Sequence, residues 1–583
     1  MPSTTHYPPY SFLRTPYLYQ IVSGLLLALA YPNTGWGFLA WFALVPLLAS
    51  LDHAQSHSQA LGFGLITGIV FFGGSLHWLT HVSTVGWMIV VLMESVYVMG
   101  FSWLAYAGMK SQRPVLFKAV WIALAWTVTE ILRSEMPVFG FGWNLLAYSQ
   151  SSYVPLIQFA NVLGAYGLGF LIALTNASLL YAWFRRKDLR TALGFVAIVV
   201  LILSGLEGYG KMTLARPVEP NEYLRVSVVQ GNIPQSVKWE VMAKEKILEI
   251  YEKLTELAAL EQPDLILWPE AAFPGYFNRD LQSARISRLA QESQAPLLIG
   301  GLHWVSEREL YNSAYFLGKD GALGQRYDKL RLVPFGEYIP LKLLFGWLTP
   351  VADALGISDF SAGKEAVVFR WAREAWPFGV LICFEDVFSD LARNLADGGA
   401  KFLIVITNDA WFGKTNAPYQ HLQTSIFRAV ENGVAVARAA NTGVSGFISY
   451  QGRVLATVKD SRGDETFGMG HKTLDLPLVT ERTLFRRGGH FFPYVAVGCF
   501  LILGLFLRNT RKRGQAPFLE KKVFVPLALI FAFCALSLSG CVRVAGSAGY
   551  RKTGADGETT EKRTSFNTAN LVSKDKTQGS ITV

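Results

Sequence analysis

Charged residues are scarce in this chain: Asp, Glu, Lys and Arg make up 16% of its 583 residues, whereas 51% are hydrophobic. This composition is too apolar for a wholly soluble enzyme and too mixed for a pure channel. The chain is also too long for one ordinary domain, so two or three units are expected. We therefore predict a bundle of membrane helices joined to a soluble domain.

Cysteine is scarce as well, with only Cys383, Cys499, Cys534 and Cys541. Cys499 and Cys534 lie within apolar runs, and no spacing resembles a zinc site or a CxxC pair. These absences argue against a disulfide framework, and we expect no metal ligands. Cys383 and Cys541 need separate explanations.

The chain lacks a concentrated basic arm, although its net charge is +10. Much of the positive charge lies in short segments between apolar stretches, such as Arg185–Lys187 and Arg511–Arg513. A nucleic-acid-binding protein would gather its basic residues on one face or arm. We therefore expect no nucleic-acid partner and interpret the pattern as membrane topology.

Long apolar stretches dominate the first third of the chain, after an N-terminal tail at residues 1–16. A membrane-spanning helix needs about 20 mostly apolar residues. Residues 17–210 contain about seven candidate stretches, and an eighth lies at 491–507. The first two are short, so they could form a re-entrant pair. The eight stretches are Tyr19–Tyr31, Trp36–Leu51, Leu61–Leu79, Trp87–Gly108, Phe117–Leu132, Pro155–Trp183, Ala192–Leu206 and Phe491–Leu507.

Lys and Arg are concentrated in three of the connecting segments, which predicts the orientation. These segments follow the fourth, sixth and eighth stretches, so all three fall on one side of the membrane. The positive-inside rule makes that side cytoplasmic, and the large segment after the seventh stretch then faces outward. A miscount by one helix would reverse the side. The basic residues are Lys110, Arg113, Lys118, Arg185, Arg186, Lys187, Arg190, Arg508, Arg511, Lys512 and Arg513.

One ionisable residue, Glu130, falls inside the fifth stretch, one turn before Arg133. A charged group within a membrane is a functional candidate by default, but a structural ion pair near the helix end is an equally good explanation. The next loop, residues 137–150, is rich in aromatic residues and glycine. It could line a path for lipid or act as an ordinary interfacial anchor.

Between residues 222 and 480 the pattern changes to short apolar runs that alternate with polar helical segments. This alternation predicts an α/β layered domain, which is large enough to fold around its own core. The expected strands include Leu224–Val229, Leu265–Leu267, Leu297–Gly300, Gly379–Ile382 and Phe402–Thr407, and the expected helices include Val241–Leu260, Leu281–Glu292, Leu391–Leu395 and Tyr419–Glu431.

Three polar side chains of this domain, Glu270, Lys329 and Cys383, suggest one chemistry. Glu270 and Cys383 each follow the end of an apolar strand, where α/β domains place active sites. A thiol is mostly protonated near neutral pH, so a carboxylate could accept its proton. An ammonium could stabilise the oxyanion formed by attack on a carbonyl and favour the thiolate. Singly, each residue has an ordinary interpretation as core, loop or surface; together they suggest acyl transfer through a thioester.

In this order and with these flanking residues, the segments resemble the nitrilase (carbon–nitrogen hydrolase) superfamily. The resemblance is closer still to its membrane-bound branch, the apolipoprotein N-acyltransferase family, and covers the chain up to about Asn509. It implies a multi-pass α-helical membrane domain and an α-β-β-α sandwich that carries a Glu–Lys–Cys triad. The matching segments are Val229–Gln235, Leu267–Ala272, Tyr327–Pro340, Leu381–Asp386, Thr407–Gly413 and Arg438–Gly443.

The resemblance implies a role for each member of the triad. Glu270 is the general base, Lys329 is the cation that stabilises the oxyanion, and Cys383 is the nucleophile. Glu337 matches a second essential glutamate, which could support the lysine or the amine step.

The resemblance also implies supporting or substrate-binding roles for Glu385, Trp239 and Asn408. Phe384 departs from the family pattern, because some members carry Tyr at this position. The missing hydroxyl argues against an essential proton transfer there and leaves the triad untouched.

The implied reaction moves the sn-1 acyl chain of a membrane phospholipid, through the cysteine, to the N-terminal amine of a diacylglyceryl-cysteine apolipoprotein. It needs no cofactor, and the chain has no Walker loop. We expect a monomer in the bacterial inner membrane with a periplasmic catalytic domain. An apolar lid should keep water from the thioester, and Leu341–Leu355 is one candidate for it, with a plain surface loop as the alternative. A membrane-anchored amidase acting on a small C–N substrate would share the triad. A non-catalytic scaffold is a third alternative.

The C-terminal segment lies beyond the resemblance. A basic linker at 508–522 leads to an apolar run at 523–541, which resembles a lipoprotein signal with the lipobox Leu538–Cys541. The polar tail, residues 542–583, is predicted to be disordered. Cys541 would be a lipidation site if a small lipoprotein is fused to the enzyme. The run could instead be a ninth helix with a chance lipobox, or a junction of two reading frames.

Overall fold

The computed structural model describes residues 17–32, 35–216, 219–220, 222–340, 359–370, 376–479 and 482–508. It also describes two paired strands of the tail, β13 (Lys552–Thr553) and β14 (Thr559–Thr560). The expected lid at Leu341–Leu355 lies outside the described residues, as do the lipobox and Cys541.

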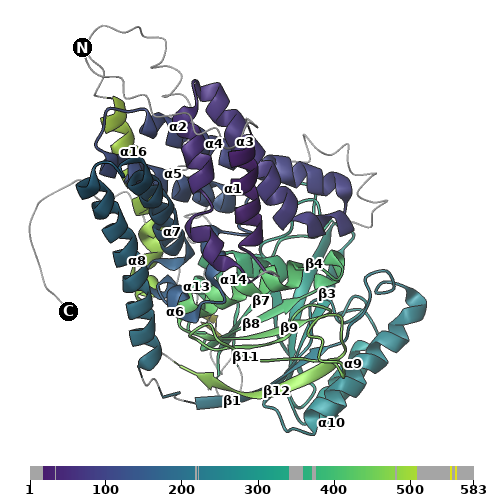
Figure 1. Ribbon diagram of the computed structural model, residues 1–583. Coiled ribbons are helices and arrows are strands. Elements are labelled where there is room, and N and C mark those ends of the chain that lie inside the picture. The colour runs from purple at the N-terminus through teal and green to yellow at the C-terminus, as the bar shows by residue number, and fades with distance from the viewer. Residues whose placement is uncertain are drawn as a thin grey trace, which may run out of the picture.

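A bundle of helices forms the N-terminal part and is completed by a helix from the end of the described chain (Figure 1). Among the described residues, α3, α4, α5, α7, α8 and α16 are long and apolar enough to cross a membrane. The first two apolar helical segments are shorter, as the sequence indicated. The helices are α1 (Leu18–Leu29), α2 (Val45–His53), α3 (His57–Ser75), α4 (Thr84–Met109), α5 (Val115–Glu135), α6 (Val154–Ile157), α7 (Ala160–Phe184), α8 (Leu189–Ala215) and α16 (Phe492–Arg508).

Small residues bring α3 and α4 close together. A Cβ atom on Gly64 would lie 2.6 Å from the Val98 carbonyl oxygen, and one on Gly68 would lie 2.7 Å from the Ser95 Cα atom. Membrane helices lack a hydrophobic driving force between them, so close backbone approach at such residues supplies much of their packing energy. The two glycines therefore fix the α3–α4 contact.

The basic loops gather at the end of the bundle that is remote from the sheets. Lys118 lies within electrostatic range of Lys110 and Arg185. The Arg113 guanidinium contacts the carbonyl oxygen of Phe506, near the end of α16. α8 starts at this end and runs toward β1 (Figure 1). The basic segments therefore share one end of the bundle, and the sheet-containing part lies at the other.

Two six-stranded sheets form the second part of the molecule. The first has the order β12-β1-β2-β3-β4-β5 and the second has the order β11-β10-β9-β8-β7-β6. The first sheet contains β1 (Glu222–Gln230), β2 (Leu265–Leu267), β3 (Leu297–Ser306), β4 (Glu309–Leu317), β5 (Leu323–Asp328) and β12 (Gly470–Leu478). The second contains β6 (Val368–Phe369), β7 (Phe378–Ile382), β8 (Phe402–Thr407), β9 (Ala435–Ala440), β10 (Gly446–Ile448) and β11 (Val454–Thr457).

The sheets pack face to face between two layers of helices. Apolar side chains such as Val226 and Ile404 fill the space between the sheets. α9 (Lys244–Ala259) and α10 (Ser283–Ser293) cover the first sheet, and α13 (Ser389–Asp397) and α14 (Ala417–Asn432) cover the second. The predicted fold class, a helical membrane domain followed by an α-β-β-α sandwich, is confirmed.

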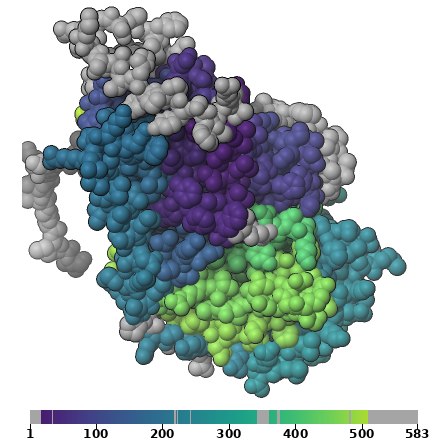
Figure 2. All heavy atoms as spheres, in the orientation of Figure 1, coloured from purple at the N-terminus to yellow at the C-terminus, as the bar shows by residue number. Residues whose placement is uncertain are grey.

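The outer layer of the sandwich packs directly on the membrane helices. Tyr148 of the membrane domain and Phe427 of α14 have ring centroids 4.9 Å apart. One hydrophobic cluster includes buried residues from both parts, among them Trp121 of α5 and Leu391 of α13. Figure 2 shows the two parts in contact along their border on this face. The sandwich is therefore seated on the bundle through α13 and α14.

Candidate active site

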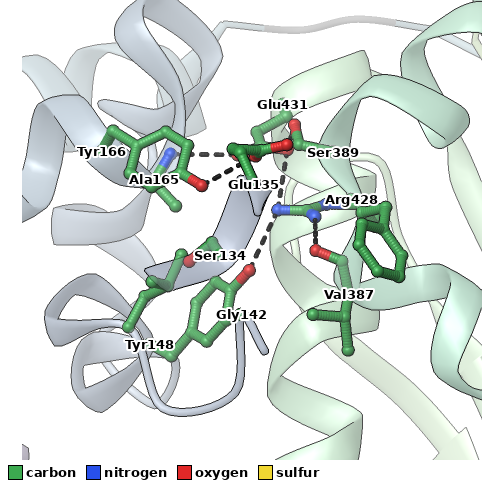
Figure 3. A pocket seen from close by; sticks show the side chains of 12 residues that line it. Ser134, Glu135, Gly142, Tyr148, Ala165, Tyr166, Val387, Ser389, Arg428 and Glu431 are labelled. Carbon is green, nitrogen blue, oxygen red and sulfur yellow. Dashed lines mark hydrogen bonds and ion pairs between the residues drawn. The ribbon is translucent and has the colours of Figure 1, made fainter. Parts of the chain in front are cut away.

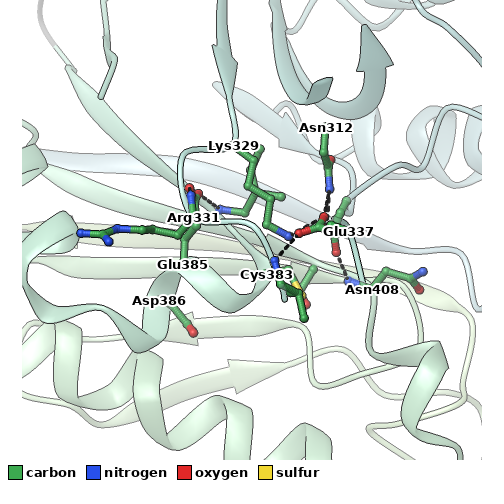
Figure 4. A network of polar contacts seen from close by, with 12 residues as sticks. Asn312, Lys329, Arg331, Glu337, Cys383, Glu385, Asp386 and Asn408 are labelled. Carbon is green, nitrogen blue, oxygen red and sulfur yellow. Dashed lines mark hydrogen bonds and ion pairs between the residues drawn. The ribbon is translucent and has the colours of Figure 1, made fainter. Parts of the chain in front are cut away.

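Lys329 follows strand β5 and lies at the centre of a buried charge cluster (Figure 4). Its side chain is 1% exposed, and its Nζ atom lies 3.3 Å from Glu270 Oε1 and 2.9 Å from Glu337 Oε1. Burial lowers the pKa of the ammonium, but the two carboxylates outweigh burial and raise it well above its usual range. Lys329 therefore stays charged at any physiological pH.

Glu270 follows the short strand β2, and polar contacts fix both of its carboxylate oxygens. The Asn312 side-chain amide donates to Oε1 at 2.8 Å, and the Asn408 backbone N–H donates to Oε2 at 2.9 Å. Burial raises the pKa of Glu270, but the charge of Lys329 and the Asn312 hydrogen bond bring it below the ordinary value. The group is thus an ionised carboxylate held in one orientation.

Cys383 ends strand β7 of the second sheet, and its backbone is strained. Its φ is +55°, a left-handed conformation that costs a residue with a side chain about 1–3 kcal/mol. Its side chain is partly exposed. Burial of its surroundings and the negative charge of Glu270 raise the pKa of the thiol well above its usual range, although Lys329 opposes the shift. Cys383 is therefore a neutral thiol at rest, and it needs a base in order to react.

The three side chains meet because their strands end at the same edge of the sandwich. β2 runs parallel to β3, and β5 shares that direction because it is antiparallel to β4. In the second sheet, β7 and β8 are parallel, and Cys383 and Asn408 follow their carboxyl ends. An ionised carboxylate, a permanent cation and a thiol thus lie together, as nucleophilic attack on a carbonyl requires.

Glu337 belongs to this cluster as a second carboxylate. Its Oε1 atom accepts hydrogen bonds from Lys329 and, at 3.0 Å, from the Asn312 side-chain amide. Its Oε2 atom accepts from the Val333 backbone N–H at 2.9 Å. Glu337 is therefore a second carboxylate partner of the Lys329 ammonium and shares the Asn312 amide with Glu270.

Glu385 lies two residues after Cys383 and accepts four hydrogen bonds. Its Oε1 atom accepts from the Tyr327 hydroxyl at 2.8 Å and from the backbone N–H groups of Leu330 and Arg331, and its Oε2 atom accepts from Ile382 N–H. Burial raises its pKa to about 7, although these bonds oppose the shift. Glu385 thus ties the end of β7 to the loop that carries Lys329.

The remaining residues that the sequence singled out surround this cluster. Asn408 is buried, and its side chain bonds to Gln235 and Asn441. The Phe384 ring is next to Cys383 in the chain and is buried, whereas Trp239 is 48% exposed. Asn408 therefore orients Glu270 through its backbone, and Trp239 presents an apolar surface to the solvent.

Sequence reasoning missed three polar residues of the site: Asn312, Lys238 and His421. Asn312 binds both glutamates, as described above. The Lys238 ammonium donates to the Glu270 carbonyl oxygen at 3.2 Å, and burial lowers its pKa to about 8. The His421 Nε2 atom lies 3.3 Å from the Cys383 carbonyl oxygen. Only Lys238 had a local signal, since it adjoins Trp239.

The aromatic loop of the membrane domain, residues 137–150, packs against the segment that contains Cys383. The Phe141 ring stacks on Phe384, with centroids 6.1 Å apart. The Arg133 guanidinium holds this loop by donating to the carbonyl oxygens of Phe141 and Trp143 at 2.8 and 2.7 Å. Membrane helix α5 therefore positions a loop that contacts the residue next to Cys383.

Among the described residues, Glu130 does not form the ion pair that was one of its two interpretations; it makes a hydrogen bond to the backbone instead. Its Oε1 atom accepts the Leu146 backbone N–H at 2.7 Å, at the far end of the same loop. Arg133 forms its ion pair with Glu94, at 3.0 Å, within the membrane domain. Glu130 and Arg133 thus hold one loop from two points.

A small polar cavity lies where the membrane domain meets the sandwich (Figure 3). Arg428 lies 2.9 Å from Glu431, and Tyr166 donates to Glu135 at 2.8 Å. The volume of the cavity is about 10 Å³, which is room for roughly one water molecule. This cavity is too small for an acyl substrate and belongs to the contact between the two parts.

Comparison with known proteins divides the chain into the same two parts as the structure, the membrane domain and the sandwich. Residues 23–178 match the Apolipoprotein N-acyltransferase N-terminal domain, and residues 225–482 match the Carbon-nitrogen hydrolase family. Apolipoprotein N-acyltransferase of Geobacter metallireducens is 35% identical over 76% of this chain and 86% of its own length. The Haemophilus influenzae protein of the same name is 32% identical over 76% and 86%.

Among solved structures, an amidase of the nitrilase superfamily from Nesterenkonia AN1 is 18% identical, with a TM-score of 0.34, over 45% of this chain and 94% of that chain. The identity and coverage shared with the Geobacter metallireducens protein decide the assignment. The chain belongs to the apolipoprotein N-acyltransferase family.

Proposed function

We propose that the protein transfers an acyl chain from a membrane phospholipid, through a thioester on Cys383, to the N-terminal amine of a diacylglyceryl apolipoprotein. The observation that carries this proposal is the cluster of Glu270, Lys329 and Cys383 in a sandwich that is seated on membrane helices. The names of the relatives support the same acceptor.

The first step forms the acyl-enzyme. Glu270 accepts the thiol proton as Cys383 Sγ attacks the sn-1 ester carbonyl, and the Lys329 ammonium stabilises the resulting oxyanion. The carbon–oxygen bond of the ester then breaks, and the proton on Glu270 passes to the departing lysophospholipid oxygen. A thioester remains on Cys383, and Glu270 is again a carboxylate.

The second step transfers the chain to the amine. The neutral α-amine of the acceptor attacks the thioester carbonyl, and Lys329 again stabilises the oxyanion. Glu270 accepts a proton from the attacking nitrogen and returns it to the departing Cys383 sulfur. The product is an amide, which is more stable than a thioester, so the transfer runs forward.

The membrane domain explains how such substrates reach the site. Each buried CH₂ group holds an acyl chain in the bilayer by about 0.8 kcal/mol, so a soluble enzyme would have to extract both substrates. In this protein, α13 and α14 pack on the membrane helices, and the aromatic loop contacts Phe384. We propose that this arrangement keeps Cys383 within reach of lipid-anchored esters and amines.

The proposed function is tested by acyl labelling of the purified full-length protein in phospholipid vesicles. A phospholipid labelled in its sn-1 chain should transfer label to the protein, and hydroxylamine should remove it, because hydroxylamine cleaves thioesters. A phospholipid labelled in its headgroup is the control and should transfer none. Addition of a diacylglyceryl-cysteine peptide should discharge the label to the peptide amine. No acyl label, or discharge to water alone, would exclude the transferase and favour the amidase alternative.

We further propose that the protein lies in the inner membrane with its sandwich on the periplasmic side. The support is the shared position of the basic loops, remote from the sheets. In a cysteine-free background, Asp320→Cys in the sandwich should react with a membrane-impermeant maleimide in cells with a permeabilised outer membrane. Lys187→Cys should react only after the inner membrane is opened. The reverse pattern would invert the topology.

A further inference from the structure

Behind the nucleophile, His421 of α14 is buried between two carboxylates. Its Nδ1 atom lies 2.9 Å from Asp409 Oδ1, and its Nε2 atom lies 3.0 Å from Asp386 Oδ1. Arg438 of β9 lies 3.2 Å from Asp386 and 3.4 Å from Asp409. All four side chains are at most 1% exposed. The group is a closed ring of two acids and two bases inside the sandwich.

The geometry identifies the protonation state of His421. Carboxylates accept hydrogen bonds, so a ring with a carboxylate at each nitrogen makes both bonds only as an imidazolium. Burial and the charge of Arg438 lower the pKa of His421, but Asp386 and Asp409 outweigh them and raise it to about 9. Two cations then balance two anions, as buried charges require.

This ring of charges contacts the strained turn that carries the nucleophile. Besides Asp386, His421 Nε2 lies 3.3 Å from the Cys383 carbonyl oxygen. Arg428, two turns further along helix α14, donates to the carbonyl oxygens of Asp386 and Val387 at 3.3 and 2.9 Å. A positive φ at a residue with a side chain persists only where its surroundings enforce it. At Cys383, α14 supplies these surroundings.

We propose that His421 is a positioning residue, which holds the strained backbone of Cys383 through its carbonyl oxygen and through Asp386. His421 does not act on the substrate. Given the proposed function, it sets the position of Cys383 within the site. Loss of the imidazolium would leave the carboxylates short of one positive charge and free the Cys383 carbonyl. The turn would relax, and the sulfur would move away from Glu270.

The membrane domain also holds α14 beside His421. The Gln420 side-chain oxygen accepts hydrogen bonds from the indole N–H groups of Trp78 and Trp143 at 3.0 and 2.9 Å. The Trp143 ring also packs on His421, with centroids 5.1 Å apart. A displacement of His421 is thus opposed both by its carboxylates and by the aromatic loop.

The proposal is tested with His421→Gln and a matched control, Thr424→Val. Thr424 lies on the same helix and is equally buried, and its hydroxyl donates to the backbone carbonyl oxygen of His421 at 2.6 Å. We expect His421→Gln to lower the single-turnover rate of acyl-enzyme formation about 10²-fold, since a misplacement of about 1 Å costs that much. The phospholipid KM should change by less than about threefold, and Thr424→Val should keep both values. Equal losses in the two variants, or a change confined to KM, would overturn the proposal.

A second measurement does not depend on the proposed function. Alkylation of Cys383 by iodoacetamide, followed by peptide mass spectrometry, should slow in His421→Gln and not in Thr424→Val. If the wild type forms no acyl-enzyme, the proposed function fails, whereas the alkylation ratio still tests the positioning. An unchanged ratio refutes it.

A third variant covers the case in which His421→Gln does not fold. Asp409→Asn removes one of the carboxylates that raise the pKa of His421, so the His421 imidazolium should lose its proton at a lower pH. The alkaline fall of the acylation rate, expected near pH 9 in the wild type from the pKa of about 9, should then begin at lower pH. Lys238 also titrates in this range, but it is the same in both proteins. An unshifted alkaline limb would contradict the role of His421.

Discussion

Replacing Cys383 by alanine is expected to abolish acyl transfer, with a loss of at least about 10⁴-fold in the rate of turnover. Removal of a covalent nucleophile leaves only the binding and electrostatic contributions of the site. A 10⁴-fold loss corresponds to about 5.5 kcal/mol of transition-state stabilisation. Both the hydroxylamine-sensitive label and the labelled peptide product should disappear, and a gel-based labelling assay with product chromatography measures the two together.

Cys499→Ala is the matched control for this variant. Cys499 has an exposed side chain on helix α16 and lies outside the sandwich, so the same substitution there should leave labelling and turnover within about twofold of the wild type. Label that persists in Cys383→Ala would show that another group carries the acyl chain, and the thioester mechanism would then be wrong.

Lys329→Met is expected to have the second-largest effect, with a loss of about 10³-fold. Methionine keeps the length of the side chain and removes the cation, so the oxyanion loses a donor whose removal typically costs 10²–10³-fold. The buried carboxylate of Glu270 and the partly buried carboxylate of Glu337 then lack their shared partner. Breaking a buried ion pair from one side also destabilises a protein by about 3–5 kcal/mol, so thermal unfolding of the variant should be measured beside its activity.

The pH dependence of Lys329→Met separates a loss of charge from a loss of fold. In the wild type, Lys329 opposes burial and keeps the pKa of Glu270 below its ordinary value. Glu270 is therefore ionised from mildly acidic pH upward, and its stabilising contribution is lost only as the pH falls through that low value. In the variant, burial dominates and the pKa of Glu270 rises, so the residual rate should increase from pH 5 to pH 8.

Lys401→Met serves as the control for this prediction. Lys401 pairs with Glu222 at 3.1 Å on the surface of the same sandwich, where both side chains are partly exposed. Pairs of this kind contribute about 0–1 kcal/mol, so activity should remain close to that of the wild type. A pH-independent residual rate in Lys329→Met would show that the lysine does not tune Glu270.

The membrane helices and the main strands could be predicted because their signals are local. The apolar stretch Trp87–Gly108 lies within helix α4, and Leu265–Leu267 and Phe402–Thr407 are strands β2 and β8. Uninterrupted apolar runs allow few alternatives in a membrane. The pairing of the strands into two sheets has no comparable local signal, and only the family resemblance predicted the sandwich.

The candidate triad could be predicted because each member has a characteristic flanking sequence. Asn312 could not, because it is one polar residue within strand β4 and its importance comes from two glutamates that lie elsewhere in the chain. His421 is one of several polar residues of α14, and its two carboxylate partners follow different strands. Such long-range charge balance leaves no pattern in the residues next to either side chain.

The contact between α13, α14 and the membrane helices has a consequence for attempts to study this enzyme in water. Cutting the chain at residue 222 would remove the membrane residues that pack against Phe427 and Leu391, and it would expose a large apolar surface on the sandwich. Such a fragment would aggregate or capture detergent in place of the missing helices. Because the membrane helices and the sandwich share one hydrophobic cluster, a mutation that loosens the bundle would also displace the Cys383 sulfur.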